Sequence, residues 1–597
     1  GSVRSIQRGG AVFAKSGNGV FVTDDRFFIR QTTAPDGWRW YDRIGNWIDY
    51  DANGRIQRYG DRNDVQVSFT RNGNGQIEQV RDHAGAMALT LTWSGDHIAT
   101  ARDRDNREVE YFWTNGQLDR VNDVLDYDWT YLYDSNGQLT QITDPENRVW
   151  EITYVQSFRV SGSGAPPGVS TSGRLARDFR VSAVWKLKNP LNKETVYEYD
   201  YSRERRQWSV IERTPGGKRT ERVYDRDGRL LSMEEGTTPT YQRTLDGPRI
   251  EILRDERGLI TRRELDSYRN PLRITYPDGS SERWTYHAQF SFPTEHIDAR
   301  GTRSTWDYDA KGNLMERVVA AGSPEAQRAT YVYNVFGERT TMTLHGLTPA
   351  EDASTHYEYD AFGNLNKITD AENGVVSRAH NGMGMVLTQT DARGKVWTFT
   401  YNARGELLTQ KDPINPATTH TYDKVGNRKT TEDPSGATTT FTYDGLDRVL
   451  TSTDDDGGVT ITTYDDDGRV TRQEDASGQF STYGYDTRGR LITVTDAAGN
   501  ITRTIYGTPS DGLDGLIAAM QYPSHREEYK YDTRDRRSQI IRIHPAEGAT
   551  PERRETTISA YDAVGNLIAS TDALGRSTLN TYDRRQRLTE STDALGG

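Results

Sequence analysis

The sequence predicts an all-β protein made of tandem hairpins, in which one long sheet spirals around an enclosed volume. Three observations carry this prediction: a repeat of about 21 residues, many aromatic but few other apolar residues, and a high density of turn residues. Of the 597 residues, 34% are hydrophobic and 10% are aromatic, and the chain holds 33 Tyr and 55 Gly. Because Tyr and Thr can pack on a neighbouring strand while exposing a hydroxyl, this composition favours a thin sheet with water on both sides.

The repeat is clearest in the second half of the chain, where tyrosines recur every 21 residues and His380 takes the one vacant position. Most of these residues are followed by Asp or Asn and, four positions after the tyrosine, by Gly. Glycine supplies the positive φ that a hairpin loop of about four or five residues requires. The tyrosines therefore predict strand ends, and the residues of this series are Tyr359, Tyr401, Tyr422, Tyr443, Tyr464, Tyr485 and Tyr506, with loop glycines Gly405, Gly426, Gly468 and Gly489.

A second series of aspartates, eleven residues further on, predicts a second turn in each unit. These turns have the form Asp-Ala-Ala-Gly or begin with Asp-Pro, both of which are turn signals. Similar aspartates carry the array back through Asp61, Asp82, Asp103, Asp123 and Asp144, where Phe69, Trp93 and Trp113 are expected to take the place of the first-turn tyrosine. The main series is Asp370, Asp391, Asp412, Asp433, Asp454, Asp475 and Asp496.

The two series divide the chain into four parts. Residues 1–40 are an N-terminal lead-in, residues 41–155 are Trp-rich divergent repeats, and residues 156–183 are a Ser/Gly/Pro-rich excursion. Residues 184–597 are the main array. The last residues, Asp593 to Gly597, match a second turn 21 residues upstream, so we expect the array to be interrupted rather than closed there.

Geometry requires such an array to coil. About 28 units would provide on the order of 56 strands of roughly six residues. Because twisted sheets seldom stay open beyond about ten strands, a ribbon of this length must wind into a spiral. Along each strand the faces alternate, so Phe399 and Tyr401 are predicted on one face and Thr400 on the other.

Sites for chemistry are not evident. The chain has no cysteine, its ten histidines are scattered, and its net charge is −12, which disfavours a nucleic-acid-binding surface. Asp465–Gly468 and Asp225–Gly228 resemble the start of a calcium loop but lack its later ligands. We therefore predict no catalytic residue, no cofactor and no metal site, and a protein that is not an enzyme; no apolar run is long enough to span a membrane.

The repeat resembles the YD repeat of the Rhs family. The matching segments are Tyr422–Asn427 and Tyr561–Leu567 at first turns, and Thr495–Asn500 and Thr571–Arg576 at second turns. The resemblance implies a hollow β-sheet cocoon, as in the shells of bacterial Rhs polymorphic toxins and in the B and C components of insecticidal ABC toxin complexes.

This resemblance also implies a function and partners. The chain would be the structural shell that sequesters a C-terminal toxic effector for interbacterial delivery, secreted or delivered from a bacterial cell, often by type VI secretion. Its expected partners are the encapsulated toxin domain or a further shell segment, and proteins of the secretion apparatus. The alternative is an extracellular adhesion or carbohydrate-binding module, in which surface aromatics such as Trp38 or Trp40 would contact sugar rings.

Overall fold

The structure is a computed structural model of the chain. It describes residues 5–8, 11–17, 20–23, 27–33, 36–155, 159–161, 183–202, 204–225, 228–508, 510–548 and 551–596. Most of the Ser/Gly/Pro-rich excursion predicted at residues 156–183 lies outside these residues.

The described residues form one sheet of 54 strands and one short 3-10 helix, η1 (Pro349–Glu351). The first strands are β1 (Ser5–Arg8), β2 (Ala11–Gly17), β3 (Val20–Thr23), β4 (Phe27–Thr33), β5 (Asp36–Asp42), β6 (Trp47–Asp51), β7 (Ile56–Gly60), β8 (Gln66–Arg71), β9 (Ile77–Arg81), β10 (Met87–Ser94), β11 (His97–Asp103), β12 (Glu108–Thr114), β13 (Gln117–Asn122), β14 (Asp128–Tyr133), β15 (Leu139–Thr143), β16 (Val149–Val155), β17 (Arg159–Ser161) and β18 (Ala183–Lys188). The middle strands are β19 (Glu194–Ser202), β20 (Gln207–Arg213), β21 (Arg219–Tyr224), β22 (Leu230–Glu235), β23 (Thr238–Leu245), β24 (Ile250–Asp255), β25 (Ile260–Leu265), β26 (Pro271–Thr275), β27 (Ser281–Tyr286), β28 (Pro293–Ile297), β29 (Arg303–Tyr308), β30 (Leu314–Val319), β31 (Gln327–Tyr333), β32 (Arg339–Leu344), β33 (Ala353–Tyr359), β34 (Leu365–Thr369), β35 (Val375–His380) and β36 (Val386–Thr390). The last strands are β37 (Val396–Tyr401), β38 (Leu407–Lys411), β39 (Thr418–Tyr422), β40 (Arg428–Glu432), β41 (Thr438–Tyr443), β42 (Val449–Thr453), β43 (Val459–Tyr464), β44 (Val470–Glu474), β45 (Phe480–Tyr485), β46 (Leu491–Thr495), β47 (Ile501–Tyr506), β48 (Ile517–Gln521), β49 (Arg526–Tyr531), β50 (Arg537–His544), β51 (Arg553–Tyr561), β52 (Leu567–Thr571), β53 (Ser577–Tyr582) and β54 (Leu588–Thr592).

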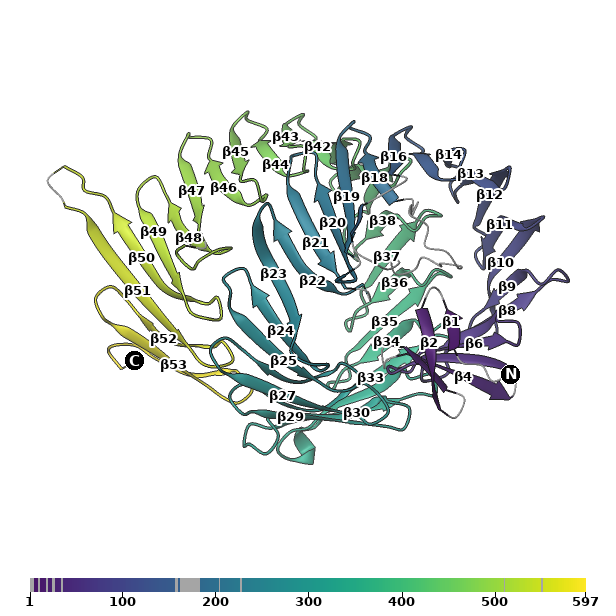
Figure 1. Ribbon diagram of the computed structural model, residues 1–597, viewed down its shortest axis with the longest axis horizontal. Coiled ribbons are helices and arrows are strands. Elements are labelled where there is room, and N and C mark those ends of the chain that lie inside the picture. The colour runs from purple at the N-terminus through teal and green to yellow at the C-terminus, as the bar shows by residue number, and fades with distance from the viewer. Residues whose placement is uncertain are drawn as a thin grey trace.

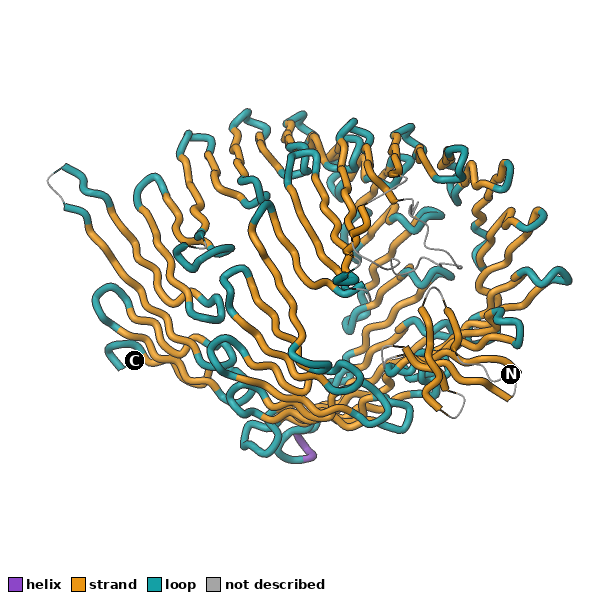
Figure 2. The backbone as a smooth tube through the Cα atoms, viewed as in Figure 1, coloured by secondary structure: helices purple, strands orange, loops and turns teal. Residues whose placement is uncertain are grey.

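Each strand pairs antiparallel with its neighbours in the chain, as a ribbon of hairpins requires. The exception is at β17, where β16 pairs directly with β18 and β17 runs parallel to the end of β19. The predicted all-β hairpin repeat is thus confirmed, and the lead-in strands β1–β5 join the same sheet. Figure 2 shows the consequence, a ribbon of strands with loops along both of its edges.

Most loops are built on one five-residue turn. In Asp423–Asn427, the N–H of Asp423 donates to the Asn427 carbonyl at 2.9 Å, and Gly426 donates back to the Asp423 carbonyl at 3.3 Å. Gly426 has φ +99°, the left-handed conformation in which a side chain would be strained. Second turns such as Asp433–Ala437 have the same bonds, so the two turns of a unit share one backbone design.

The two turns differ in the strand pairing beside them. At the second turn that begins at Asp433, pairing continues without a break, with Glu432 opposite Thr438. At the first turn, Thr421 lies opposite Thr430 but Tyr422 lies opposite Arg428, so one residue of the return strand is left over. The same shift occurs beside Tyr359, Tyr401, Tyr443, Tyr464 and Tyr485. A β-bulge increases local twist, and one bulge per unit gives the ribbon a regular coil.

The ribbon winds back so that distant hairpins lie edge to edge (Figure 1). The sheet has little conventional core: the buried apolar residues are few, and the face that carries the tyrosines is only half-buried. The fully buried ones include Ile29, Trp47, Leu265 and Phe290, at 3–7% exposure, near the N-terminal strands. Hydrogen bonds and side-chain contacts between hairpins therefore carry much of the cohesion.

Candidate functional site

The first-turn tyrosine joins adjacent units through its hydroxyl. Tyr422 donates to the carbonyl of Leu407 at 2.8 Å, and Leu407 is the residue opposite Tyr401 at the preceding bulge. The same bond, to the carbonyl 15 residues back and at 2.7–3.1 Å, is made by Tyr154, Tyr286, Tyr308, Tyr401, Tyr443, Tyr464, Tyr485 and Tyr582. Tyr359 reaches the equivalent carbonyl, that of Arg339, across a longer loop. We call this bond the tyrosine staple.

The N-terminal repeats make the staple with other donors. The indole N–H groups of Trp93 and Trp113 donate to the carbonyls of Ile77 and Ile98 at 2.7 and 2.8 Å. The assignment of Phe69 to this position was wrong. Arg71 occupies it instead and donates to the Ile56 carbonyl at 2.8 Å. This position requires an N–H or O–H donor, so an aromatic ring alone does not identify it. Phe69 packs on Tyr59 instead.

The aspartates after the tyrosines close their own turns. Asp444 accepts the backbone N–H groups of Leu446 and Arg448 on one oxygen, and the Arg448 side chain on the other at 2.7 Å. The Arg448 guanidinium then lies 4.4 Å from the centre of the Tyr464 ring in the next unit. The same chain of contacts links Asp465, Arg469 and Tyr485, and Asp486, Arg490 and Tyr506.

The predicted second-turn aspartates occupy the same capping position. Each of Asp370, Asp391, Asp433, Asp475 and Asp496 accepts the backbone N–H groups two and four residues further on. Asp412 differs, because its loop contains two prolines; it caps Ile414 and Asn415. The loop glycines Gly405, Gly426, Gly468 and Gly489 have φ values between +84° and +99°.

Ionisation at these positions follows from burial and capping. Burial raises the pKa of the Tyr401 hydroxyl and raises the pKa of Tyr308 to about 12, so both remain hydrogen-bond donors at neutral pH. For Asp465, burial alone would raise the pKa, but hydrogen bonds from the Arg469 amide and guanidinium outweigh it and hold the pKa below its ordinary value. His380 fills its position with a ring that is only 7% exposed.

A second set of contacts joins one coil of the ribbon to the next. Second turns between residues 61 and 302 meet first turns between residues 309 and 587, and we call this line of contacts the seam. Partners lie 232 to 299 residues apart in sequence. They include Asn63 with Asn313, His83 with Phe336, Arg107 with Ala403, Arg148 with Asp447, Gly216 with Asp467, Arg257 with Asp535, Arg488 with Glu256, and Arg534 with Asp278.

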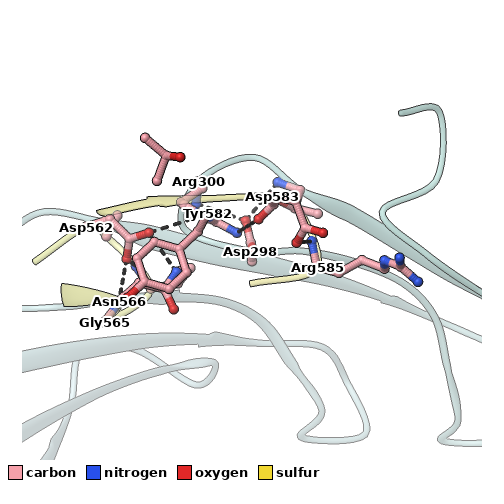
Figure 3. Close-up of polar contacts among 12 residues, drawn as sticks. Asp298, Arg300, Asp562, Gly565, Asn566, Tyr582, Asp583 and Arg585 are labelled. Atoms are coloured by element: carbon pink, nitrogen blue, oxygen red, sulfur yellow. Dashed lines mark hydrogen bonds and ion pairs between the residues drawn. The ribbon is translucent and has the colours of Figure 1, made fainter. Parts of the chain in front are cut away.

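Arginine is the main side chain of the seam. From the second turn Asp298–Thr302, Arg300 reaches the Asp562 carboxylate at 3.3 Å and the Asp583 carbonyl at 3.1 Å, thereby bridging two first turns of the next coil (Figure 3). Arg488 is 11% exposed and reaches Glu256 at 2.5 Å, Asp514 at 3.4 Å and Glu235 at 3.5 Å.

Polar packing at the seam is close. The side-chain amides of Asn63 and Asn313, 6% and 3% exposed, exchange hydrogen bonds of 3.0 and 2.9 Å. A Cβ on Gly337 would lie 2.0 Å from the Asn63 amide nitrogen, so only glycine fits there. The sequence alone did not reveal these partners, because nothing local relates residues so far apart.

The aspartates of the calcium-like segment Asp465–Gly468 make structural contacts. Asp465 caps its turn, Asp466 pairs with Lys193, and Asp467 accepts the Gly216 amide across the seam. In the described part of the chain, no three His, Asp or Glu side chains are grouped as metal ligands would be, and no helix has the length and apolarity to cross a membrane. Residues 226–227 of the other calcium-like segment lie outside the described residues. Trp38 and Trp40, the example residues of the sugar-binding alternative, are partly buried against Ile29.

Comparisons with known proteins agree with the repeat. Residues 297–460 match the Teneurin YD-shell family, and residues 464–501 and 561–597 match the RHS Repeat family. A curated relative, Toxin protein Tse5 of Pseudomonas aeruginosa, is 24% identical over 321 residues, which are 48% of this chain and 24% of the relative. The chain therefore spans about a quarter of that relative's length.

Two solved structures are also similar. The structure of TcdB2-TccC3 without the hypervariable C-terminal region has a TM-score of 0.46 at 12% identity, over 96% of this chain and 32% of that one. The Photorhabdus luminescens Tc holotoxin pore has a TM-score of 0.40 at 12% identity, over 96% of this chain and 35% of that one. The chain thus carries YD-shell sequence in its middle and RHS repeats towards its C-terminus, in agreement with the YD-repeat resemblance of its sequence.

Proposed function

We propose that this chain forms the wall of a hollow shell that encloses a toxic effector polypeptide. The observation that carries the proposal is the seam: a single ribbon that winds around and bonds to itself 232 to 299 residues further on makes a continuous wall. The relationship to a curated protein named as a toxin supports the kind of cargo. In this proposal the repeat sets strand length, turn position and coil, and the cargo does the chemistry.

The proposal extends to partners and delivery. The enclosed partner is a toxin domain, or a further shell segment, that lies C-terminal to this region. The assembled particle is released from a bacterial cell, with the type VI secretion apparatus as the delivery route and rival bacteria as the target. The YD-shell and RHS matches support a shell region, and Tse5 supports a bacterial toxin context.

Electron microscopy of the purified chain tests the wall. We expect a curved shell with one continuous wall and an open interior, whereas a compact particle of several lobes contradicts the proposal. A protease experiment on the natural full-length protein tests the cargo. The segment C-terminal to residue 597 should resist cleavage while the wall is intact and become sensitive when Arg300→Ala and Arg488→Ala weaken the seam.

The adhesion or carbohydrate-binding alternative rests on aromatic side chains that are exposed. Trp113 and Trp185 are 36% and 41% exposed. This alternative predicts saturable binding on a glycan array that is lost in Trp185→Ala. An empty array, together with an enclosed effector, favours the shell.

A further inference from the structure

A cavity lined by aromatic rings and cationic side chains lies at the seam. Its volume is about 540 Å³, which is in the range of small-molecule sites. Strands β4, β5 and β6 and the turns that follow β5 and β7 form one side. The loop between β27 and β28 and the turn between β29 and β30 form the other. The Ser291 amide donates to the Arg43 carbonyl across the two sides at 3.0 Å, so the cavity forms only in the wound wall.

Aromatic rings form the apolar part of the lining. Phe28 of β4 and Tyr41 of β5 lie opposite each other in the sheet, and their rings stack with centres 5.1 Å apart. Both side chains are only half-buried, so part of their surface is available to a ligand. Trp47 and Phe290 also line the cavity and are 7% and 5% exposed. A planar aromatic group can therefore pack against this wall.

The charged part of the lining has an excess of cations. Among the described residues, five cationic side chains and two carboxylates, Asp42 and Asp64, line the cavity. One of the cations, Arg39, is neutralised by Asp49, which accepts its guanidinium at 2.6 and 2.7 Å. An excess of two positive charges remains, in a chain whose net charge is −12. The four cations that make no ion pair with a described residue are Arg30, Arg43, Arg62 and Lys311.

Contacts within the wall hold two of these four cations in place. The Arg43 guanidinium lies 3.6 Å from the centre of the Tyr268 ring and donates to the Ala288 carbonyl at 3.0 Å, a neutral acceptor that does not offset its charge. Gly45 has φ +95°, and a Cβ on it would lie 2.5 Å from the Arg62 Cβ, so this turn packs directly on Arg62. Both arginines are therefore positioned before a ligand binds.

The other two cations are exposed, so they can adjust to a ligand. The Arg30 guanidinium lies 5.6 Å from the centre of the Tyr41 ring, beside the aromatic wall. Lys311 belongs to the first turn Asp309–Asn313 on the opposite side of the cavity. We propose that the cavity binds a phosphate monoester carried on an aromatic body. The dianion matches the excess of two positive charges, the ring packs against Phe28 and Tyr41, and guanidinium groups donate well to phosphate oxygens.

Calorimetry with naphthyl phosphate as the probe tests both halves of the site on the whole chain. We expect one ligand per chain, with naphthol and inorganic phosphate each binding about tenfold more weakly or not at all. Naphthoate, which has the same ring and a single negative charge, should bind about fivefold more weakly. Inorganic phosphate that binds as tightly as the probe contradicts the aromatic contact. Naphthol or naphthoate that binds as tightly contradicts the match of charge.

Two variants test whether the probe binds in this cavity. Arg30→Gln and Lys311→Gln should each weaken binding of naphthyl phosphate by about fivefold, and neither leaves a described carboxylate without its ion-pair partner. Arg55→Gln is the matched control, because Arg55 is an exposed cation in the loop between β6 and β7 and does not line the cavity. Its binding should equal that of the unaltered protein. Absence of binding to the unaltered protein, unchanged binding in both cavity variants, or an equal loss in Arg55→Gln overturns the proposal.

Discussion

Two of the second turns share one backbone design but differ in their surroundings. In Asp298–Thr302 and in Asp391–Lys395, the aspartate caps the backbone N–H groups two and four residues on, and each turn carries arginine at its third position. Arg300 reaches Asp562 across the seam. Arg393 is exposed, and among the described residues nothing from another coil bonds to it. Turn geometry is therefore local, whereas the role of the tip residue depends on where the coil places it.

The largest effect is expected where one seam arginine holds several carboxylates. Arg488→Ala should destabilise the wall by about 3 kcal/mol, because it leaves the Asp514 and Glu256 carboxylates without their cation. Arg393→Ala should change stability by less than about 0.5 kcal/mol. Urea unfolding followed by hydrogen exchange in β24 and β46 measures both. Equal losses of unfolding free energy in the two variants would mean that the seam does not contribute to stability.

Removing one staple should cost less. Tyr464→Phe keeps the ring but removes the bond to the Val449 carbonyl, with an expected loss of about 1 kcal/mol. The control is Tyr483→Phe, whose hydroxyl makes an exposed contact of 3.3 Å with Gln473, and for which we expect a loss within about 0.5 kcal/mol. Local exchange rates in β42 and β43 provide the readout. Similar values for both would show that the ring, not the hydroxyl, joins the units.

High salt should weaken the ion pairs of the seam but not the backbone pairing of the sheet. At about 1 M salt the screening length falls to roughly 3 Å, so partly exposed seam pairs such as Arg148 with Asp447 should each lose less than about 1 kcal/mol. Backbone pairing within each hairpin should be unaffected. Scattering and circular dichroism at rising salt concentration distinguish the two. A particle whose dimensions stay constant while seam turns remain protected would contradict an electrostatic seam.

The smallest expected effect is a change in the slope of stability against pH. Asp465 and Asp496 both have a pKa held below the ordinary value of 3.8, the latter by the Asn500 side chain and then its amide. A depressed pKa in the folded state stabilises the protein above the unfolded pKa, and that stability disappears as pH falls through the folded value. Asp→Asn variants keep the capping oxygen but cannot ionise, so acid unfolding below about pH 4 should flatten in both. If only the Asp465→Asn variant shows a flatter slope of stability against pH, the effect arises from the seam and not from the capped turn.

Much of the hairpin could be predicted from sequence. The position of Tyr422, with Asp423 and Gly426 after it, located a strand end and a turn, since strand alternation and positive φ are local properties. The bulge and the staple could not be predicted this way. The staple uses a carbonyl 15 residues away, and Arg71 shows that a donor with no aromatic ring can make it. The aromatic pattern therefore predicts Phe69 wrongly at this position.

The seam was beyond sequence reasoning for a different reason. The distance between Asn63 and Asn313, or between Gly216 and Asp467, results from twist accumulated over many strands. A small change in twist per strand would place a different turn opposite each seam residue.

The bridging contact of Arg300 has a consequence for how such walls change size. It bonds to two successive first turns, Asp562 through the side chain and Asp583 through the backbone, and both turns have the same capped design. If one whole unit is lost or gained within a coil, the tip of each second turn contacts the first turn one unit further along the next coil, and that turn has the same design. Circumference can then change in steps of one unit, so a lineage could resize its container without redesigning the closure.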